Sequence, residues 1–217
     1  MAPIWNDPNP VLVTKIEDLQ IFSALDNSFI TTFEAAPETH SHAFFEVFTA
    51  LEGEFAVELL GGDSLLIKPD CLCLIPPGVY HYAHNVSESA SKLAVRFSYS
   101  CAQESGTSGQ NSVFAICRDT LERCRTAQIV TGCEKLCQII QTIIQERNAP
   151  HFASNAYVET LFTQFYIELI RMFREQGEAE TPQTAPSGGA IEQDTRRVKI
   201  ENYILFRYQE DITEDDE

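Results

Sequence analysis

The sequence is poor in basic residues and contains no long apolar run. Its 217 residues include 15 Lys and Arg against 32 Asp and Glu, which gives a net charge of −17 at pH 7. A surface of that sign repels phosphate backbones, so these residues alone are not expected to bind DNA. No stretch of about 18 consecutive apolar residues occurs, and this excludes a membrane-spanning helix on length.

Two further absences bear on where the protein works. The N-terminus has no basic segment followed by an apolar segment, as a secretory signal would have. The seven cysteines are odd in number and scattered, which is not the pattern of a disulfide framework. We therefore predict free thiols in a reducing cytoplasm.

The composition that remains is that of a packed globular chain. Hydrophobic residues make up 44% of the sequence and aromatic residues 10%, too many for a disordered protein. The length suits one substantial domain with an appendage, or two small domains.

Short runs rich in β-branched and aromatic residues occupy most of residues 11–99, and several breaks between them hold turn residues, as at Gly61-Gly62-Asp63. We expect strands at 11–14, 19–23, 29–33, 46–51, 54–60, 64–67, 71–75 and 92–99. Their close spacing predicts an antiparallel sandwich or barrel, and we assign residues 11–112 to it, with the polar stretch 103–112 as a loop. Residues 1–10 contain three prolines and Trp5 and are predicted to form an extended arm.

Helical periodicity follows, and we assign residues 113–176 to a helical segment. A first helix is expected over residues 132–147, with Thr131 and Glu134 at capping-box spacing. A second helix is expected to begin near Ser154. It carries apolar residues at alternating gaps of four and three, namely Val158, Phe162, Phe165, Leu169 and Met172. This is the spacing of a coiled-coil seam, so we predict a homodimer interface there, with packing against the barrel as the alternative.

The last part of the chain changes character again. Residues 177–193 hold prolines and glycines and few large apolar residues, which is typical of a linker. Residues 194–217 form one amphipathic helix pattern and a possible cap for another, at Thr213 and Asp216. Since one amphipathic helix cannot bury its own apolar face, we expect the sequence to be cut from a longer protein.

One constellation carries ligand chemistry. His40 and His42 alternate on a strand and would share a face about 6.6 Å apart along the backbone. Glu46 would lie about 13 Å beyond His42 on a straight strand, so the chain must turn or bulge between them for Glu46 to join the group. With His81, these residues offer three imidazoles and one carboxylate, a set that suits a divalent metal such as Zn, Ni, Fe or Mn.

This spacing resembles the two cupin motifs. The first is matched by His40, His42, Glu46 and Gly53, and the second by Pro76-x-Gly78, His81 and Asn85. The sequence departs from the second motif at Asp70, where the family usually has glycine. The resemblance covers roughly residues 33–99. It implies a mainly β fold, a double-stranded β-helix or jelly roll, with the site inside the barrel mouth and helices after it.

The order of barrel, antiparallel helix pair, linker and amphipathic segment resembles the AraC/XylS family of transcription regulators. Residues 198–213 resemble the opening helix of that family's DNA-binding domain. The resemblance implies that the barrel binds a small-molecule effector, that the helices dimerise, and that helix-turn-helix units missing from this sequence bind DNA. No catalytic residue is expected under this interpretation.

Two interpretations of the site remain open. The cluster either holds a metal or forms a buried polar group that hydrogen-bonds an effector directly. The residues predicted to contact the effector are His40, His42, Glu46, His81, Phe33, Phe48 and Trp5. The competing hypothesis is a metal-dependent cupin enzyme, an oxygenase or isomerase of a small polar substrate, in which the same histidines and Glu46 hold iron, manganese or zinc. Arg96 would add an anion contact only if its side chain points inward.

Overall fold

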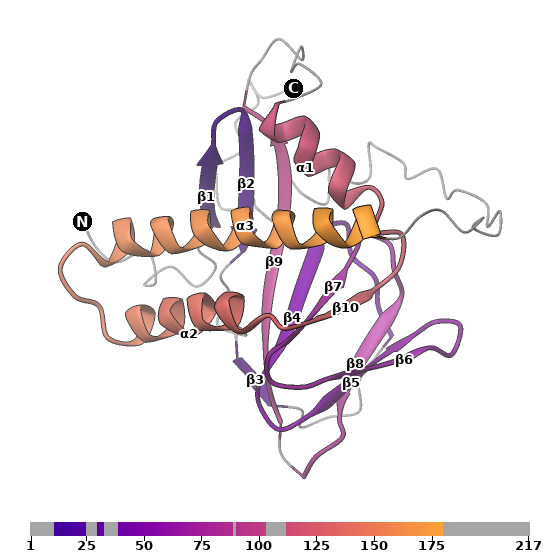
Figure 1. Ribbon diagram of the computed structural model, residues 1–217. Helices are drawn as coiled ribbons and strands as arrows, with labels where there is room; N and C mark the ends of the chain where they lie inside the picture. The colour runs from indigo at the N-terminus through magenta and orange to yellow at the C-terminus, as the bar shows by residue number, and fades with distance from the viewer. Residues whose placement is uncertain (1–10, 25–29, 33–38, 89, 103–111, 180–217) are drawn as a thin grey trace, which may run out of the picture.

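A computed structural model of the chain describes residues 11–24, 30–32, 39–88, 90–102 and 112–179 (Figure 1). Within these ranges the chain forms strands followed by three helices. The strands are β1 (Val11–Ile16), β2 (Leu19–Ala24), β3 (Ile30–Thr32), β4 (Phe45–Glu52), β5 (Phe55–Leu59), β6 (Ser64–Ile67), β7 (Cys71–Ile75), β8 (His81–Asn85), β9 (Ser91–Cys101) and β10 (Gln128–Thr131). The helices are α1 (Val113–Leu121), α2 (Glu134–Asn148) and α3 (Ser154–Ala179).

The strands form two antiparallel sheets. The larger has the order β1-β2-β9-β4-β7-β10, with β3 also paired to β9, and the smaller has the order β6-β5-β8. β4 lies at the centre of the larger sheet, paired with β9 on one side and β7 on the other. Its first six residues are all buried, because helices cover one face of this sheet and the smaller sheet faces the other.

The two faces of the larger sheet belong to different cores. On β4, Phe45 and Val47 point toward the helices, where they join a core with Phe97 and the helical side chains. Phe48 and Ala50 point the other way, into a second core shared with Phe55 and Val57 of β5. This alternation follows from the period of two along a strand. Glu46 alternates with Phe45 and Val47, and therefore belongs to the barrel interior.

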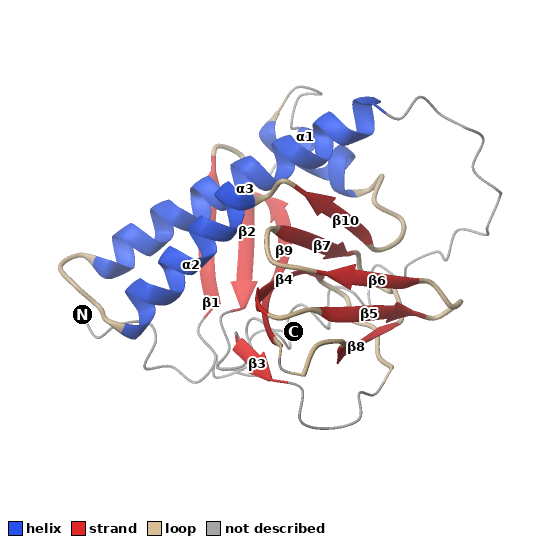
Figure 2. Cartoon of the chain, turned by 60° about the horizontal axis from the view of Figure 1, so that its bottom comes forward, coloured by secondary structure: helices blue, strands red, loops and turns tan. Residues whose placement is uncertain are grey.

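All three helices lie on the same side of the larger sheet (Figure 2). α2 and α3 run antiparallel side by side, and α3 contacts β1 and α1. Tyr166 on α3 is fully buried, and its hydroxyl lies 2.5 Å from the Ser23 hydroxyl of β2. The helices are thus an integral layer of the same packed unit as the sheet.

Each strand expected from the sequence is present, with bounds that differ by at most a few residues. The structure adds β8, α1 and β10, which the sequence did not reveal. β8 has the sequence His-Tyr-Ala-His-Asn, and its polar residues hid the strand pattern. β10 pairs with β7, so the segment 113–176 is not purely helical as predicted: four of its residues complete the larger sheet.

The predicted capping box before the first long helix is wrong. Thr131 ends β10, α2 begins at Glu134, and its N-cap is Cys133, which makes no side-chain capping hydrogen bond. Gly132, with a φ of +73°, makes the sharp turn from strand to helix that a residue with a side chain rarely adopts. The strand pairing of Thr131 with Cys71 therefore overrides the local capping pattern.

The apolar stripe on α3 faces the protein's own sheet. Val158, Phe162, Phe165 and Leu169 are completely buried in the single chain, and Met172 packs against the same core. The prediction that these five side chains form a subunit interface is therefore corrected: the alternative, packing on the barrel, holds. The alternating gaps of four and three define an apolar face on α3 but do not determine what that face packs against. In this protein it packs against the face of the larger sheet that the smaller sheet does not cover. A homodimer through another surface stays a prediction.

The remaining boundaries fall near the limits of the described chain. α3 continues to Ala179, so the predicted linker cannot begin at residue 177. The rest of residues 177–193, the amphipathic segment 194–217 and the arm 1–10 lie outside the described residues. Among the helices that are described, none combines the length and apolar character that a membrane crossing requires.

Candidate functional site

Glu46 stands at the centre of the site. It lies on β4, opposite Ile75 of β7 and Arg96 of β9, and is only 2% exposed. Its neighbours in the barrel interior are otherwise apolar, among them Phe48 and the fully buried Cys73. A carboxylate in such surroundings requires compensating partners, because an unpaired buried charge is very costly.

The histidine motif reaches Glu46 through a bend in the chain. His40 and His81 form a two-residue antiparallel bridge, with N to O distances of 3.0 and 2.9 Å. The chain then bends at Ala43 and Phe44 before β4 begins. This confirms the turn that the spacing of His42 and Glu46 required.

His42 is held between a backbone carbonyl and the carboxylate. Its Nδ1 lies 2.8 Å from the carbonyl oxygen of Phe44, and its Nε2 lies 3.0 Å from Oε2 of Glu46. The ring also stacks on the Phe44 ring at 4.1 Å between centroids. Both ring nitrogens of His42 therefore face oxygen atoms, one of the backbone and one of the Glu46 carboxylate.

His81 is completely buried, and its ring is oriented like that of His42. Its Nδ1 lies 3.0 Å from the carbonyl oxygen of Val79, which identifies Nδ1 as the donor. Nε2 faces Oε2 of Glu46 at 3.5 Å and has no hydrogen-bond partner. A buried imidazole nitrogen without a hydrogen bond is unusual in proteins and calls for an explanation.

Arg96 completes the set from β9. Its Nε donates to Oε1 of Glu46 at 3.1 Å, and its guanidinium lies over the Phe44 ring at 5.8 Å from the centroid. Burial opposes ionisation of Glu46, but the imidazoles of His42 and His81 and the charge of Arg96 hold its pKa well below the usual value of 4.5. Glu46 is therefore an anion at neutral pH.

The donor set fits a divalent metal ion. One ligand atom each from His40, Glu46 and His81 lie within 4.8 Å of one another. Both His42 and His81 have Nδ1 fixed by a backbone carbonyl and Nε2 turned to Glu46, as is usual for metal-binding histidines. An ion would also give Nε2 of His81 a partner, because this nitrogen would then be one of its ligands. His42 contacts Glu46 but lies outside the group of three, so the four-residue metal set predicted from the sequence is brought together only in part.

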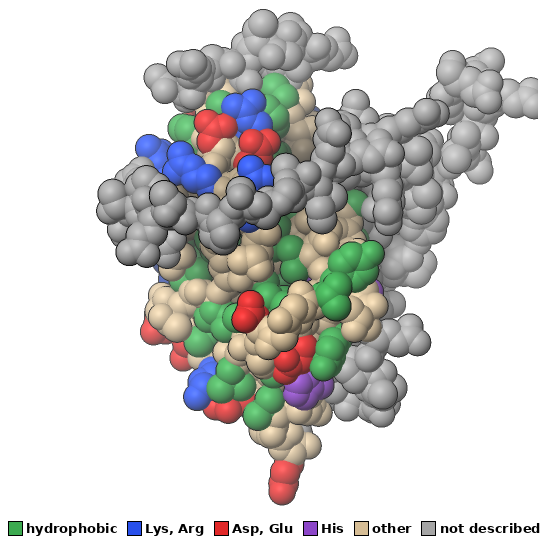
Figure 3. Space-filling view, turned by 90° about the vertical axis from the view of Figure 1, so that its right-hand side faces the viewer, with side chains coloured by type: hydrophobic (Ala, Val, Ile, Leu, Met, Phe, Trp, Pro, Cys, Tyr) green, Lys and Arg blue, Asp and Glu red, His purple; other side chains and the backbone are tan. Residues whose placement is uncertain are grey.

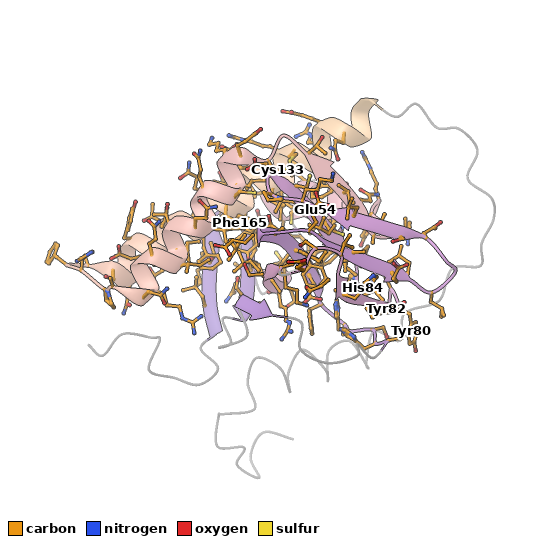
Figure 4. All side chains as sticks on the ribbon, turned by 90° about the horizontal axis from the view of Figure 1, so that it is seen from below. Glu54, Tyr80, Tyr82, His84, Cys133 and Phe165 are labelled. Carbon is orange, nitrogen blue, oxygen red and sulfur yellow. The ribbon has the colours of Figure 1, made fainter. Side chains whose placement is uncertain are left out.

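Of the other residues predicted to contact the effector, only Phe48 lies within the described part of the chain. Phe48 is buried in the barrel interior with its ring centroid 6.1 Å from that of His81, as a pocket wall would be. Phe33 and Trp5 lie outside the described residues. Tyr82 alternates with the buried residues of β8 and lies with His84 on the outer face of the small sheet, away from the barrel interior, as Figure 4 shows for these labelled residues. Strand alternation therefore keeps the Tyr82 side chain out of the barrel interior.

The outer face of the small sheet is a separate surface. Leu60 is 75% exposed and Tyr80 is 51% exposed. Hydrophobic side chains are visible on this side of the molecule beside acidic and histidine side chains (Figure 3). His84 Nε2 lies 4.0 Å from Oε1 of Glu58, a weak surface contact far less constrained than those of His81.

Sequence reasoning left the direction of the Arg96 side chain undecided and did not place Cys73 beside the site. Both follow from strand alternation once the facing of β9 and β7 is known: Phe97 faces the helices, so Arg96 faces the barrel. Burial, and then the nearby charge of Glu46, raise the pKa of Cys73 to about 12, so this thiol stays protonated beside the site.

Comparison with known proteins agrees with this architecture. Residues 31–96 match the Cupin_2 family, described as a cupin domain. No curated protein matches the chain. A protein of known structure from Neisseria meningitidis is 19% identical with a TM-score of 0.29, over 41% of this chain and 82% of its own.

Two further structures are similar at the same level. A cupin family protein with a double-stranded β-helix fold from Methanocaldococcus jannaschii is 17% identical with a TM-score of 0.28, over 40% of this chain and 78% of its own. The iron(II) form of HppE in complex with substrate is 16% identical with a TM-score of 0.28, over 40% of this chain and 52% of its own. With the cupin match over residues 31–96 and the two antiparallel sheets, the fold is a cupin barrel followed by C-terminal helices.

Proposed function

We propose that this chain is the effector-sensing region of an AraC-type transcription regulator, and that its cupin barrel binds a small polar metabolite at the cluster of Glu46, His81 and Arg96. The observation that carries the proposal is the direct connection between this site and the helices. Arg96 and Phe97 are adjacent on β9 and face opposite sides of the sheet.

The connection runs through one strand. Arg96 bonds Glu46 in the barrel, while the Phe97 ring lies 5.2 Å from the Tyr166 ring of α3. A ligand that draws Arg96 or Glu46 from its present contacts displaces β9, and the packed layer of Phe97 and Tyr166 passes that displacement to α3. The residues that follow α3 are those predicted to form the linker and the start of the DNA-binding domain. A cytoplasmic location and a homodimer remain predictions within this proposal.

The test separates ligand binding from its transmission. A thermal-shift screen of small polar metabolites should identify a compound that raises the melting temperature. In the full-length protein, Phe97→Leu should keep the affinity for that compound and lose the effect of the compound on binding to the protein's own upstream DNA. The proposal fails if the full-length gene encodes no helix-turn-helix, or if no ligand alters DNA binding by the unmodified protein.

A second candidate, a metal-dependent cupin enzyme, is favoured by the unpartnered Nε2 of His81. His40, Glu46 and His81 would hold the ion, which when bound supplies a Lewis acid for a small polar substrate. Arg96 would then fix the orientation of the Glu46 carboxylate, and Phe48 would exclude water from the inner side.

Metal content and turnover distinguish the two candidates. Protein purified without chelator should contain about one equivalent of metal for a single site, lost in His81→Ala and retained in the matched variant His84→Ala, whose histidine faces outward. Turnover of a substrate that disappears with the metal favours the enzyme. Equal metal content in both variants contradicts the assignment of His81 as a ligand.

A further inference from the structure

The barrel-facing side of β9 carries a second basic residue besides Arg96. Lys92 shares that side of the strand with Arg96, lies opposite Ala50 of β4, and is partly buried. Its ammonium lies 4.6 Å from the centroid of the Phe48 ring, so the Lys92 side chain faces the barrel interior. Neither of the functions proposed above assigns a role to Lys92.

The Lys92 ammonium is drawn along the barrel wall toward Arg96. Phe48 pairs with Ala94, which lies midway between Lys92 and Arg96 on the same side of β9. An ammonium over the Phe48 ring is therefore closer to Arg96 than the position of Lys92 on the strand requires. Ala94 has a side chain too short to separate the two cations, and it is 8% exposed, so water reaches the wall beside it.

This part of the wall offers charged N–H donors to an anion. The contact of Arg96 with Glu46 engages Nε, which is only one of the N–H donors of a guanidinium, and the Arg96 side chain is 32% exposed. Charged donors form stronger hydrogen bonds with a carboxylate than neutral donors do, and partial burial strengthens them further. A carboxylate above Ala94 is therefore within the range of two long basic side chains.

The facing strand β8 offers an acceptor that lacks a donor. His84 points to the outer face of the small sheet (Figure 4), so the next residue, Asn85, faces the barrel interior, opposite Phe55 of β5. Oδ1 of Asn85 is buried and has no hydrogen-bond partner. A buried acceptor without a donor is costly, and a donor group on a ligand would remove that cost.

The nearby positive charge determines which donor suits Asn85. The Phe55 ring opposite Asn85 lies 6.1 Å from the Phe48 ring, over which the Lys92 ammonium lies. A cationic donor on the ligand would be repelled by that ammonium, whereas a hydroxyl group would not. The two walls together favour a ligand with a carboxylate at one end and hydroxyl groups toward the other.

We propose that the ligand of the barrel is a small hydroxycarboxylate. Lys92 and Arg96 bind its carboxylate above Ala94, and a hydroxyl group donates to Oδ1 of Asn85. This inference rests on the proposed sensing function and names the chemical class of the effector. It also places the anion on β9, the strand that contacts both the barrel interior and the helical layer.

The experiment compares matched probes on the full chain by thermal shift and calorimetry. The probes are glycerate and gluconate as hydroxycarboxylates, glycerol and glucitol as their neutral counterparts, and propionate and hexanoate as carboxylates without hydroxyl groups. At least one hydroxycarboxylate should raise the melting temperature more than its two counterparts do, because a ligand of the folded state stabilises that state. Its affinity should fall as salt is added.

Variants of the two walls assign the contacts. Lys92→Met keeps the side-chain stem and should weaken binding of the best hydroxycarboxylate by about tenfold to a hundredfold, while Lys92→Arg should restore most of the affinity. Asn85→Ala should weaken the same ligand but leave the affinity for propionate and hexanoate unchanged. The control Lys68→Met removes an exposed lysine that pairs with Glu54, and should change neither. Melting of each free variant verifies that it is folded.

Two outcomes overturn the inference. One is that the neutral counterparts stabilise the chain as much as the hydroxycarboxylates, and the other is that Lys92→Met binds the carboxylates as tightly as the wild type. If a ligand of another class alters DNA binding by the full-length protein and none of these probes binds, the hydroxycarboxylate inference fails while the sensing function stands. If a hydroxycarboxylate binds as described without altering DNA binding, the sensing function fails and the assignment of the ligand class stands.

Discussion

At the scale of single residues, the site depends on how one buried charge is balanced. The two oxygens of Glu46 receive different partners, Arg96 on Oε1 and His42 on Oε2. Removing the carboxylate charge leaves a guanidinium and an imidazole facing each other across an apolar interior. Breaking such a pair costs more than the pair itself contributes, because the remaining charge stays buried.

We therefore expect Glu46→Gln to lower the free energy of unfolding of metal-free protein by about 3 kcal/mol, within the range for removing one partner of a buried ion pair. Denaturant unfolding in the presence of chelator measures this loss. The matched variant Glu58→Gln removes a surface carboxylate that bonds Ser64, and should cost less than about 1 kcal/mol. Equal losses in both variants would show that Glu46 is not the charge centre of the site.

At the scale of elements, two hydrogen bonds join secondary structures that are distant in sequence. Ser23 of β2 and Tyr166 of α3 share a buried bond, and Asp18, in the turn between β1 and β2, accepts from the Phe114 N–H at the start of α1 at 3.1 Å. Ser112 caps the same helix through the Ala115 N–H. These bonds position the helical layer on the sheet, while apolar burial supplies most of the stability.

The bond between Ser23 and Tyr166 lends itself to a double-mutant cycle. Tyr166→Phe leaves a buried hydroxyl on Ser23 without its partner and should cost about 1 to 3 kcal/mol. The double variant Ser23→Ala, Tyr166→Phe should cost less than the sum of the single variants, since both polar groups are then gone. Strict additivity in chemical denaturation would contradict a bond between β2 and α3.

Asp18 should contribute to acid sensitivity. Burial opposes its ionisation, but hydrogen bonds from the Phe114 N–H and the Ser112 side chain lower its pKa below the usual value of 3.8. A lowered folded-state pKa gives stability that is present above the unfolded-state pKa and is lost as the pH falls through the folded-state value. Asp18→Asn should therefore lower stability at neutral pH and flatten its decline below about pH 4. Unfolding curves across this range measure the effect, and the exposed Asp119→Asn should leave the decline unchanged.

The buried stripe of α3 makes a related prediction. Phe162 is fully buried against the rings of Phe165 and Tyr166, so Phe162→Ala should cost about 3 to 5 kcal/mol of unfolding free energy. Since its partners are in the same chain, the loss should not depend on protein concentration. The half-exposed Tyr157→Ala on the same helix serves as the control, with a change of about 0.5 kcal/mol or less. A concentration-dependent loss would place Phe162 between subunits after all.

At the scale of the whole molecule, the net charge of −17 is the dominant property. Self-repulsion of like charges destabilises the compact state, and salt screens it as the Debye length falls from about 30 Å at 0.01 M to about 10 Å at 0.1 M. The melting temperature of the chain should therefore rise over this range, while an uncharged osmolyte at matched osmolarity should not reproduce the ionic-strength dependence.

In the same buffers the chain should not retard duplex DNA, and retardation at low salt would contradict the charge argument.

Much of the architecture could be predicted because the signals were local. The alternation of β-branched residues with turns located most strands, and the two histidine motifs placed the site in a barrel. The sequence did not predict β8 because most of its residues are polar, and even the buried His81 is a histidine. It did not predict β10 because a strand of four residues just before a helix carries little periodic pattern. The predicted capping box was wrong because Thr131 pairs with Cys71 as the last residue of β10 and so does not cap the helix.

The sequence by itself determined the chemistry of the site, since the types and spacing of His40, His42, Glu46 and His81 are covalent properties of the chain. It also determined the acidic charge and the apolar stripe of α3. Only the tertiary structure decided what each group faces. Arg96 faces the Glu46 carboxylate, the apolar stripe of α3 faces the chain's own sheet, and the Cys133 thiol faces the thioether of Met172. Periodicity defines a face of a helix or strand, but its partner depends on contacts between residues far apart in sequence, which local pattern does not specify.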